Sequence, residues 1–195
     1  MKKIALIAAA AALTFSAQAL AQDYKKITIA TEGAYAPWNF KDSAGNLVGF
    51  ELDLAKDLCA RMKIECTIVE QAWDGIIPSL QAKKYDVIMA GMSITAKRME
   101  TITFSRDYAA TPGSFVVTKD SPFADFSTSL SALTLDDVSA EERADLDKMI
   151  ATFKGKTIGV QTSTTHENFL REIMGDNVDI RTYDTQENLD LDLQA

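Results

Sequence analysis

The chain has 195 residues, which is enough for one large domain or two small ones. Its formal net charge is −8, and such an acidic balance argues against a nucleic-acid-binding protein and against electrostatic docking on anionic lipid.

Residues 1–21 are typical of a secretory signal peptide. Lys2 and Lys3 precede an uncharged apolar stretch over residues 4–15, and the run SAQALAQ follows with small residues at cleavage spacing. We expect cleavage after Ala21, with Ala19 as the alternative. The mature chain is therefore predicted to be exported, and the loss of both lysines would take its formal charge from −8 to −10.

The mature chain begins with a strand pattern and then a helix pattern. The run KITIAT (26–31) is rich in β-branched residues, which predicts a strand. From residue 50 an apolar residue recurs at every fourth position, which predicts an amphipathic helix with acidic residues in its first turn. The apolar positions of this helix are Phe50, Leu54, Leu58 and Met62, and the polar positions are Glu51, Asp53, Asp57 and Arg61.

The same alternation continues through residue 92. CTIVE (66–70) predicts a second strand, and YDVIMAGM (85–92) predicts a third. WDGIIPSLQAKK (73–84) predicts a short helix with Asp74 as its N-cap and with Pro78 early enough to be tolerated. This order of elements predicts a parallel sheet with right-handed crossovers.

Both cysteines, Cys59 and Cys66, lie within the run CARMKIEC. The export signal places them in an oxidising compartment, so we predict a disulfide that joins the end of the helix to the next strand. A metal pair is the alternative, but no histidine or further cysteine stands nearby to complete a closed site.

The second half of the chain resumes the alternation after an irregular stretch. SFVVTKD (114–120) predicts one more strand, and the following residues to 139, rich in Ser, Thr, Asp and Leu, predict a surface excursion. The later predicted elements are a helix that carries Leu146, Met149, Ile150 and Phe153 and ends at Gly155, a strand over 156–161, a helix over 163–174 that closes on Gly175, a strand over 178–183, and a helix that begins near residue 185.

We therefore expect an α/β protein of two lobes, residues 22–111 and 119–195, with an extended crossing between them at 112–118. The second lobe is expected to be incomplete, because its last predicted helix begins where the chain stops.

In open parallel sheets, ligands gather beyond the carboxyl ends of the strands. The segments that follow the predicted strands are TEGAYAPWNF, EQAWDG, AGMSITAKR and QTSTTHEN, and each is rich in small, hydroxylic or aromatic residues. We expect these segments to face one cleft.

The chemistry of these segments suits an amino acid ligand. Arg98 offers a planar guanidinium fork for a carboxylate. Ala90, Gly91 and Ser93 leave backbone amides and a hydroxyl open to a close-fitting ligand. The run STT (163–165) at a helix start offers amides, hydroxyls and the positive end of the helix dipole.

Tyr35 and Trp73 are suited to clamp a flat or cationic side chain, and Glu32 to neutralise its charge. Taken alone, Arg98 is more often a solvated helix arginine and Trp73 a packing residue. Glu32 is most often a surface acid, and residues 163–165 an ordinary N-cap. Their convergence on one predicted cleft favours the functional interpretation.

Enzyme signatures are weak in this sequence. His166 is the only histidine, and its alignment with Phe169, Leu170 and Ile173 on a predicted helix favours a core edge or a cleft rim. No Gly-rich phosphate loop, metal-ligand spacing or nucleophile elbow appears in the sequence. We therefore predict a binding protein with no catalytic residue, no metal and no cofactor.

Several runs together resemble the periplasmic solute-binding proteins of ABC importers for polar amino acids. These runs are AYAPWNF, GFELDLAKDLCARMKIEC, WDGIIPSLQAKKYDVIMAGMSITAKRMETITFSRDYAA and GVQTSTTHENFL. Within that family, the likeness is greatest to the binding proteins for lysine/arginine/ornithine, for histidine, and for octopine and nopaline. The resemblance implies a two-lobed α/β periplasmic-binding-protein fold of type II and a location in the periplasm.

The resemblance also implies roles for individual residues. Arg98 would pair with the ligand α-carboxylate, helped by Ser93 and by the amide of Thr165. Tyr35 and Trp73 would sandwich the ligand side chain. The remaining implied contacts are Glu32 at the distal cation, the backbones of Ala90 and Gly91, and Gln161 and Thr164 on the far lobe. The pair Cys59–Cys66 matches the disulfide of the basic amino acid binders.

Two departures from the family's pattern are the residues at 90–91 and the early end of the chain, and further residues indicate the branch. Ala90 and Gly91 stand where those proteins often carry serines, which makes room for a bulkier ligand. Glu32 with Trp73 and the excursion at 120–150 favour the opine-binding branch. The chain also ends before the second-lobe acid that binds the α-amine in the family, so it is expected to be about two thirds of such a protein.

We therefore expect a monomeric binding protein that captures a cationic amino acid or an arginine-derived opine and delivers it to a membrane permease. The alternatives are the sensor domain of a membrane receptor and a periplasmic enzyme similar to cyclohexadienyl dehydratase. The enzyme would need an acid/base group in the cleft, for which Glu32 is the candidate.

Overall fold

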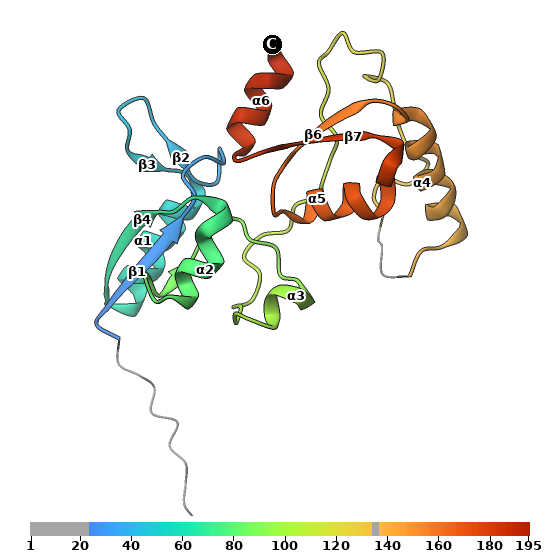
Figure 1. Ribbon diagram of the computed structural model, residues 1–195. Coiled ribbons are helices and arrows are strands. Elements are labelled where there is room, and N and C mark those ends of the chain that lie inside the picture. The colour runs from blue at the N-terminus through green and yellow to red at the C-terminus, as the bar shows by residue number, and fades with distance from the viewer. Residues whose placement is uncertain (1–23, 134–136) are drawn as a thin grey trace, which may run out of the picture.

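The computed structural model describes residues 24–133 and 137–195, and the predicted signal peptide lies outside them. Two α/β units make up the described chain (Figure 1). The first contains a sheet of three strands in the order β4-β1-β5, and the second contains a sheet of two strands, β6 and β7. All strand pairs within these two sheets are parallel, which confirms the predicted α/β class.

The first sheet is built around β1 (Lys26–Thr31). β4 (Glu65–Glu70) pairs with its whole length, and β5 (Val87–Ile88) pairs with its second half. The strands at 26–31 and 66–70 were predicted correctly. The third strand is shorter than the predicted 85–92, because the chain leaves the sheet after Ile88 and turns at Gly91, whose φ is 59°.

Two helices cover opposite faces of this sheet. α1 (Phe50–Met62) packs on the face that carries Ile29, through Ala55 and Cys59. The 3-10 turn η1 (Trp73–Gly75) and α2 (Ile76–Gln81) cover the face that carries Ala30. Adjacent residues of a strand point to opposite faces, so β1 joins two separate hydrophobic clusters.

The buried face of α1 differs from the prediction. Phe50, Leu58 and Met62 are 48%, 39% and 53% exposed, whereas Glu51 and Leu52 are buried with Ala55 and Cys59. Residues 50–62 do form a helix, as the four-residue periodicity predicts. The helix, however, packs on the sheet through Ala55 and Cys59 and not through the predicted apolar positions. Close packing of a helix on a sheet favours a short side chain such as Ala55 at the contact. The interpretation of Glu51 as a polar-face residue was therefore wrong.

The start of the second helix also differs from the prediction. Asp74 is not an N-cap, because α2 begins after Gly75 and no side chain caps it. Asp74 lies instead within the 3-10 turn η1. The chain also forms a hairpin of β2 (Phe40–Lys41) and β3 (Leu47–Val48) that no pattern predicted.

The first unit ends with α3 (Ala96–Met99), a single turn in which the hydroxyl of Thr95 accepts a hydrogen bond from the amide of Arg98 (3.2 Å). The described residues between 100 and 139 contain no helix or strand, so the predicted strand at 114–120 is wrong. Among the described residues, no strand pairs with this segment. Val116 is 70% exposed, and the Phe115 ring lies 5.1 Å from that of Phe153.

The second unit follows the predicted order closely. Its elements are α4 (Ala140–Phe153), β6 (Thr157–Gln161), α5 (Thr165–Phe169), the π-helical turn η2 (Leu170–Met174), the 3-10 turn η3 (Gly175–Asn177), β7 (Asp179–Tyr183) and α6 (Gln186–Gln194). Its core joins α4, β6 and η2 through Met149, Phe153, Val160, Leu170 and Met174. Gly155 and Gly175 both have positive φ, as expected where each helix ends.

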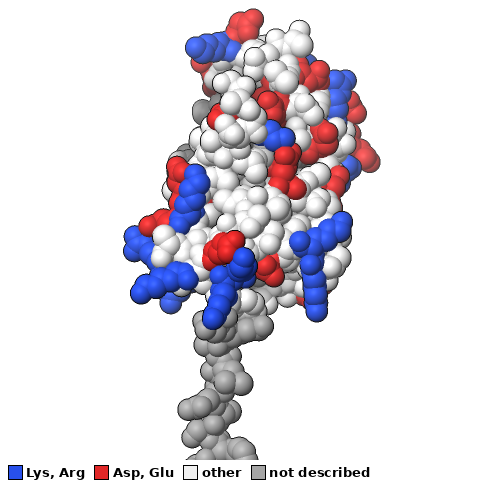
Figure 2. Space-filling model, turned by 90° about the vertical axis from the view of Figure 1, so that its left-hand side faces the viewer, with Lys and Arg blue, Asp and Glu red and all other residues white. Residues whose placement is uncertain are grey.

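Charge is unevenly distributed on the first unit. Lys and Arg gather at the lower end of the face in Figure 2, near the start of β1. The lysines at the starts of the three strands are Lys25 before β1 and Lys26 as its first residue, Lys63 before β4, and Lys83 and Lys84 before β5. Positive charge therefore lies at the amino ends of the strands, away from the carboxyl ends where a ligand is expected. Within the described residues, no helix is long and apolar enough to cross a membrane.

Cys59 and Cys66 form the predicted disulfide, with their Cα atoms 6.2 Å apart. The bond closes a short loop between the end of α1 and the second residue of β4.

Replacement of both cysteines by serine should lower the free energy of unfolding by about 2–3 kcal/mol, because the short loop regains its conformational freedom in the unfolded chain. Urea unfolding of the exported protein measures this difference. Equal midpoints for the wild type and the double variant would show that the bond contributes nothing to stability.

Candidate ligand-binding site

The predicted site residues lie at the carboxyl ends of the strands in both units. Glu32 follows β1, Trp73 follows β4, Gly91 follows β5, and Gln161 is the last residue of β6. Hydrogen bonds from Glu32, Trp73 and Arg98 of the first unit reach Gln161 and Ser163 of the second. We call this contact region between the two units the seam.

One contact across the seam joins Glu32 to Gln161. The Gln161 Nε2 donates to Glu32 Oε1 and also to the backbone carbonyl of Asp184, at 3.1 Å. Glu32 and Gln161 are only 5% and 8% exposed. Burial raises the pKa of Glu32, and the nearby negative charges of Asp184, Asp74 and Glu51 raise it further. None of the ion pairs within the described residues includes Glu32, so this acid has no cationic partner there.

A second contact joins Arg98 to the other unit. One guanidinium nitrogen of Arg98 donates to the carbonyl of Ser93 (2.8 Å) and the other to the carbonyl of Ser163 (3.2 Å). The guanidinium carbon lies 5.5 Å from the centroid of the Trp73 ring. Burial lowers the pKa of Arg98. Both acceptors are neutral, so the charge of Arg98 meets no carboxylate in the described part of the chain.

The carbonyl of Ser163 is the shared acceptor on the far side of the seam. It accepts from Arg98 and also from the indole Nε1 of Trp73, at 3.3 Å. Ser163 has a φ of 59°, which a residue other than glycine rarely adopts.

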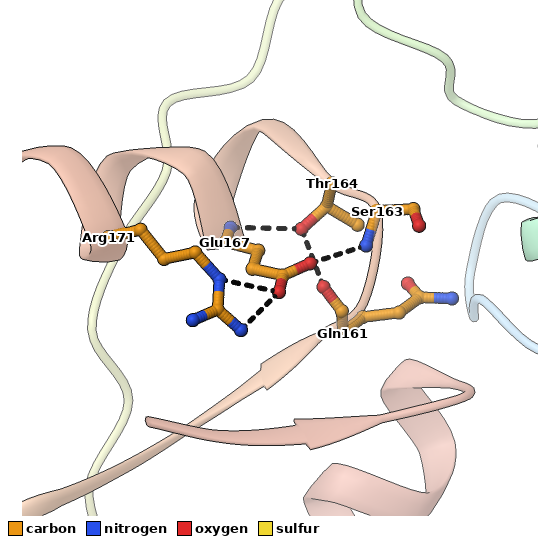
Figure 3. Close-up of polar contacts among 5 residues, drawn as sticks. All are labelled: Gln161, Ser163, Thr164, Glu167 and Arg171. Atoms are coloured by element: carbon orange, nitrogen blue, oxygen red, sulfur yellow. Dashed lines mark hydrogen bonds and ion pairs between the residues drawn. The ribbon is translucent and has the colours of Figure 1, made fainter. Parts of the chain in front are cut away.

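The contacts around Ser163 hold this strained turn in place (Figure 3). Glu167 accepts from the amide of Ser163 (2.6 Å) and from the guanidinium of Arg171 (2.7 and 2.9 Å). The hydroxyl of Thr164 donates to the carbonyl of Gln161 (2.7 Å) and accepts from the amide of Glu167 (3.2 Å). The carbonyl of Ser163 is therefore oriented toward the first unit by its own helix.

Tyr35, Gly91 and Ser93 border a cavity of about 280 Å³ together with Trp38 and residues 104–111. A Cβ atom at Gly91 would lie 3.3 Å from the Tyr35 ring, and the φ of Gly91 is 59°. The positive φ favours glycine at this position, and a side chain there would press on the Tyr35 ring.

The structure joins several of the predicted residues by direct contacts, whereas Glu32, Trp73, Arg98 and Gln161 are not among the residues that line the cavity beside Tyr35. Ala90 is 3% exposed and packs with Trp73 in the hydrophobic cluster of the first unit, so Trp73 also has the packing role that the sequence left open. Thr164 caps α5, and Thr165 is its first residue. His166 is exposed, beside Gly113. Within the described residues, no cluster of His, Cys, Asp and Glu is suited to a metal ion.

Sequence reasoning missed several groups at this site. The carbonyl of Ser163 could not be recognised, because a backbone acceptor leaves no signal in side-chain types. The spacing of Thr164 and Glu167 is a capping signal that could have indicated the ordered turn. Glu51 and Tyr108 were missed because their partners lie far away in the sequence.

Comparison with known proteins identifies the family. Residues 27–186 match the bacterial extracellular solute-binding proteins, family 3. The chain belongs to this family. It is 51% identical over 189 residues to the octopine-binding periplasmic protein of Rhizobium meliloti. The matched region covers 97% of this chain and 64% of that protein. It is 38% identical to the histidine-binding periplasmic protein of Salmonella typhimurium, over 100% of this chain and 67% of that protein.

Solved structures show the same fold. An ancestral arginine-binding protein bound to arginine matches with a TM-score of 0.70 and 29% identity, over 88% of this chain and 66% of that one. The chain thus spans about two thirds of the length of these relatives. The predicted family and the α/β periplasmic-binding-protein fold are confirmed. The periplasmic relatives agree with the export signal that the sequence predicts.

The buried Glu32 should make the ligand-free solute-binding protein less stable at neutral pH. Its folded-state pKa lies above the ordinary value of 4.5, so its unfavourable contribution is absent below that value and develops as the pH rises through the folded-state pKa. Glu32→Gln should therefore raise the free energy of unfolding near pH 7 and change it little near pH 4.

Urea unfolding at both pH values tests this expectation, with the exposed Glu100→Gln as the control. A Glu32→Gln variant that is no more stable than the wild type near pH 7 would contradict it.

Proposed function

We propose that this solute-binding protein is the substrate-binding component of an ABC importer. It captures a cationic amino acid or an arginine-derived opine between its two lobes and delivers the ligand to a membrane permease. The observation that carries this proposal is the pair of opposite charges, Glu32 and Arg98, both on the first unit. Within the described residues, neither forms an ion pair with another side chain.

A zwitterionic ligand with a cationic side chain supplies the missing partners of both groups. Its carboxylate pairs with the guanidinium of Arg98, which keeps further N–H donors beyond the two that contact Ser93 and Ser163. Its distal cation pairs with Glu32, where nearby acids already disfavour a buried negative charge.

The remaining site residues shape the pocket around the ligand. Tyr35 and Gly91 border the cavity on the first lobe. Trp73 is not among the cavity's lining residues, and its ring lies 5.5 Å from the guanidinium carbon of Arg98, the proposed partner of the ligand carboxylate. Thr164 and the amide of Thr165 approach the ligand carboxylate from the second lobe. The name of the octopine-binding relative supports an opine as a ligand class, and the names of the histidine- and arginine-binding relatives support a basic amino acid.

Closure of the two lobes is the mechanism of capture in this proposal. The crossing at 112–118 lacks a helix or strand and is mostly exposed, so it is able to act as the hinge. In the closed state, Ser163 and Gln161 of the second lobe contact Arg98 and Glu32 of the first. In this proposal, Arg98 and Glu32 therefore contact both the ligand and the second lobe.

Arg98→Ala should weaken the binding of arginine and of octopine by a factor of about 100 or more, because the ligand carboxylate loses its charged partner in a buried site. Isothermal titration calorimetry measures this change. Arg61→Ala is the control, because Arg61 is an exposed arginine that pairs with Asp57 on α1.

Wild-type binding of arginine or octopine with no binding of glutamate would support the assignment of Glu32 to the distal cation. Unchanged affinity in Arg98→Ala would remove Arg98 from the site. Preferred binding of glutamate would contradict the role of Glu32.

A further inference from the structure

Glu51 in the first turn of α1 is a buried carboxylate whose role the proposed function does not explain. It is 1% exposed, and no ion pair within the described residues includes it. An exposed acid would already interact favourably with the amino end of a helix, so the helix dipole does not require burial. Burial of an unpaired carboxylate is costly unless hydrogen bonds replace its water.

The hydrogen bonds of Glu51 come from three separate segments. Its Oε2 accepts from the side-chain amide of Asn39, and its Oε1 accepts from the amide of Gly91 (2.7 Å) and from the hydroxyl of Tyr108. The hydroxyl of Tyr108 also accepts from the amide of Gly91, at 3.2 Å. One carboxylate therefore gathers the loop after β1, the loop after β5 and the chain that leaves the first unit.

Each of these partners belongs to, or supports, the ligand site. Asn39 accepts from the amide of Gly33 (2.7 Å), the residue directly after Glu32. Gly91 lies against the Tyr35 ring, on the wall of the cavity. Tyr108 lies a few residues before the proposed hinge at 112–118 and borders the same cavity.

We infer that Glu51 is a positioning residue of the ligand site. Its carboxylate sets the two loops that carry Glu32 and Gly91 against each other and ties both to Tyr108 at the start of the hinge. The inference rests on the proposed function for its link to ligand affinity. Tyr108 and the amide of Gly91 donate to the same carboxylate oxygen of Glu51. A movement of the hinge that displaces Tyr108 would therefore also shift Gly91 beside the cavity.

The environment of Tyr108 supports this arrangement. Burial and the bond to Glu51 raise the pKa of Tyr108 well above its ordinary range. The hydroxyl therefore stays protonated and remains a donor to Glu51 at physiological pH.

A buried acid that merely stabilises the fold would look similar, and the second unit contains a matched example. Asp145 in α4 is 3% exposed and accepts from the amide (3.0 Å) and hydroxyl (2.8 Å) of Ser129 and from the amide of Leu130 (2.9 Å). None of these partners belongs to the ligand site. Asp145→Asn is therefore the control for Glu51→Gln.

The test compares Glu51→Gln, Tyr108→Phe and Asp145→Asn in the full chain, with arginine and octopine as ligands. Calorimetry measures affinity, thermal melting measures stability, and amide hydrogen exchange reports the segment around Gly91. We expect Glu51→Gln to bind about tenfold more weakly or worse, because a charged hydrogen bond to the pocket wall is lost. Tyr108→Phe should show a smaller loss with little change in melting temperature, and both variants should exchange faster at Gly91.

Asp145→Asn should lower the melting temperature but leave affinity and exchange at Gly91 unchanged. The inference is overturned if Tyr108→Phe and a folded Glu51→Gln both retain wild-type affinity and exchange. It is also overturned if Asp145→Asn loses as much affinity per degree of lowered melting temperature as Glu51→Gln does. If the wild type binds neither ligand, the proposed function fails, and exchange at Gly91 still decides whether Glu51 positions the loop.

Discussion

The candidate site depends on two oppositely charged side chains, the buried Glu32 and the half-buried Arg98, which lie where the two units meet and form no ion pair with each other. Glu32 and Arg98 both belong to the first unit, and each meets a neutral group of the second unit, the amide of Gln161 and the carbonyl of Ser163. A buried charge satisfied only by neutral dipoles remains electrostatically unbalanced. In the proposed function, a ligand that brings a carboxylate and a cation supplies the missing partners of both side chains. Their contacts with Gln161 and Ser163 also join the two units.

The two units contribute different kinds of groups to the seam. On the first unit, side chains supply the charge. The carboxylate of Glu51 accepts hydrogen bonds from Asn39 in the loop after β1 and from Gly91 in the loop after β5. On the second unit, the backbone supplies an acceptor, and the strained turn at Ser163 is fixed by Glu167, which Arg171 holds in turn. In both units, a carboxylate thus accepts hydrogen bonds from the backbone of a segment that carries predicted site residues.

Trp73 and Ala90 show why structural and functional interpretations are not exclusive. Both lie in the hydrophobic cluster under α2, and the indole N–H of Trp73 still reaches Ser163 across the seam. A large aromatic residue with one polar atom suits a position at the edge of a core, because its body packs while its tip bonds outward. The same packing fixes the indole face over which the guanidinium of Arg98 lies.

The sequence by itself determined the parallel class of the two main sheets, the disulfide and most of the order of the elements, and it placed the predicted site residues after the strands. These follow from local periodicity, from cysteine placement and from the rule that ligands meet the carboxyl ends of parallel strands. Only the tertiary structure decided that Glu51 is buried while Phe50 and Met62 of the same helix are exposed. It also decided that residues 114–120 form no strand and that the Ser163 carbonyl meets Arg98. These outcomes depend on which distant segment occupies each face, and neither a helical period nor a strand propensity contains that information.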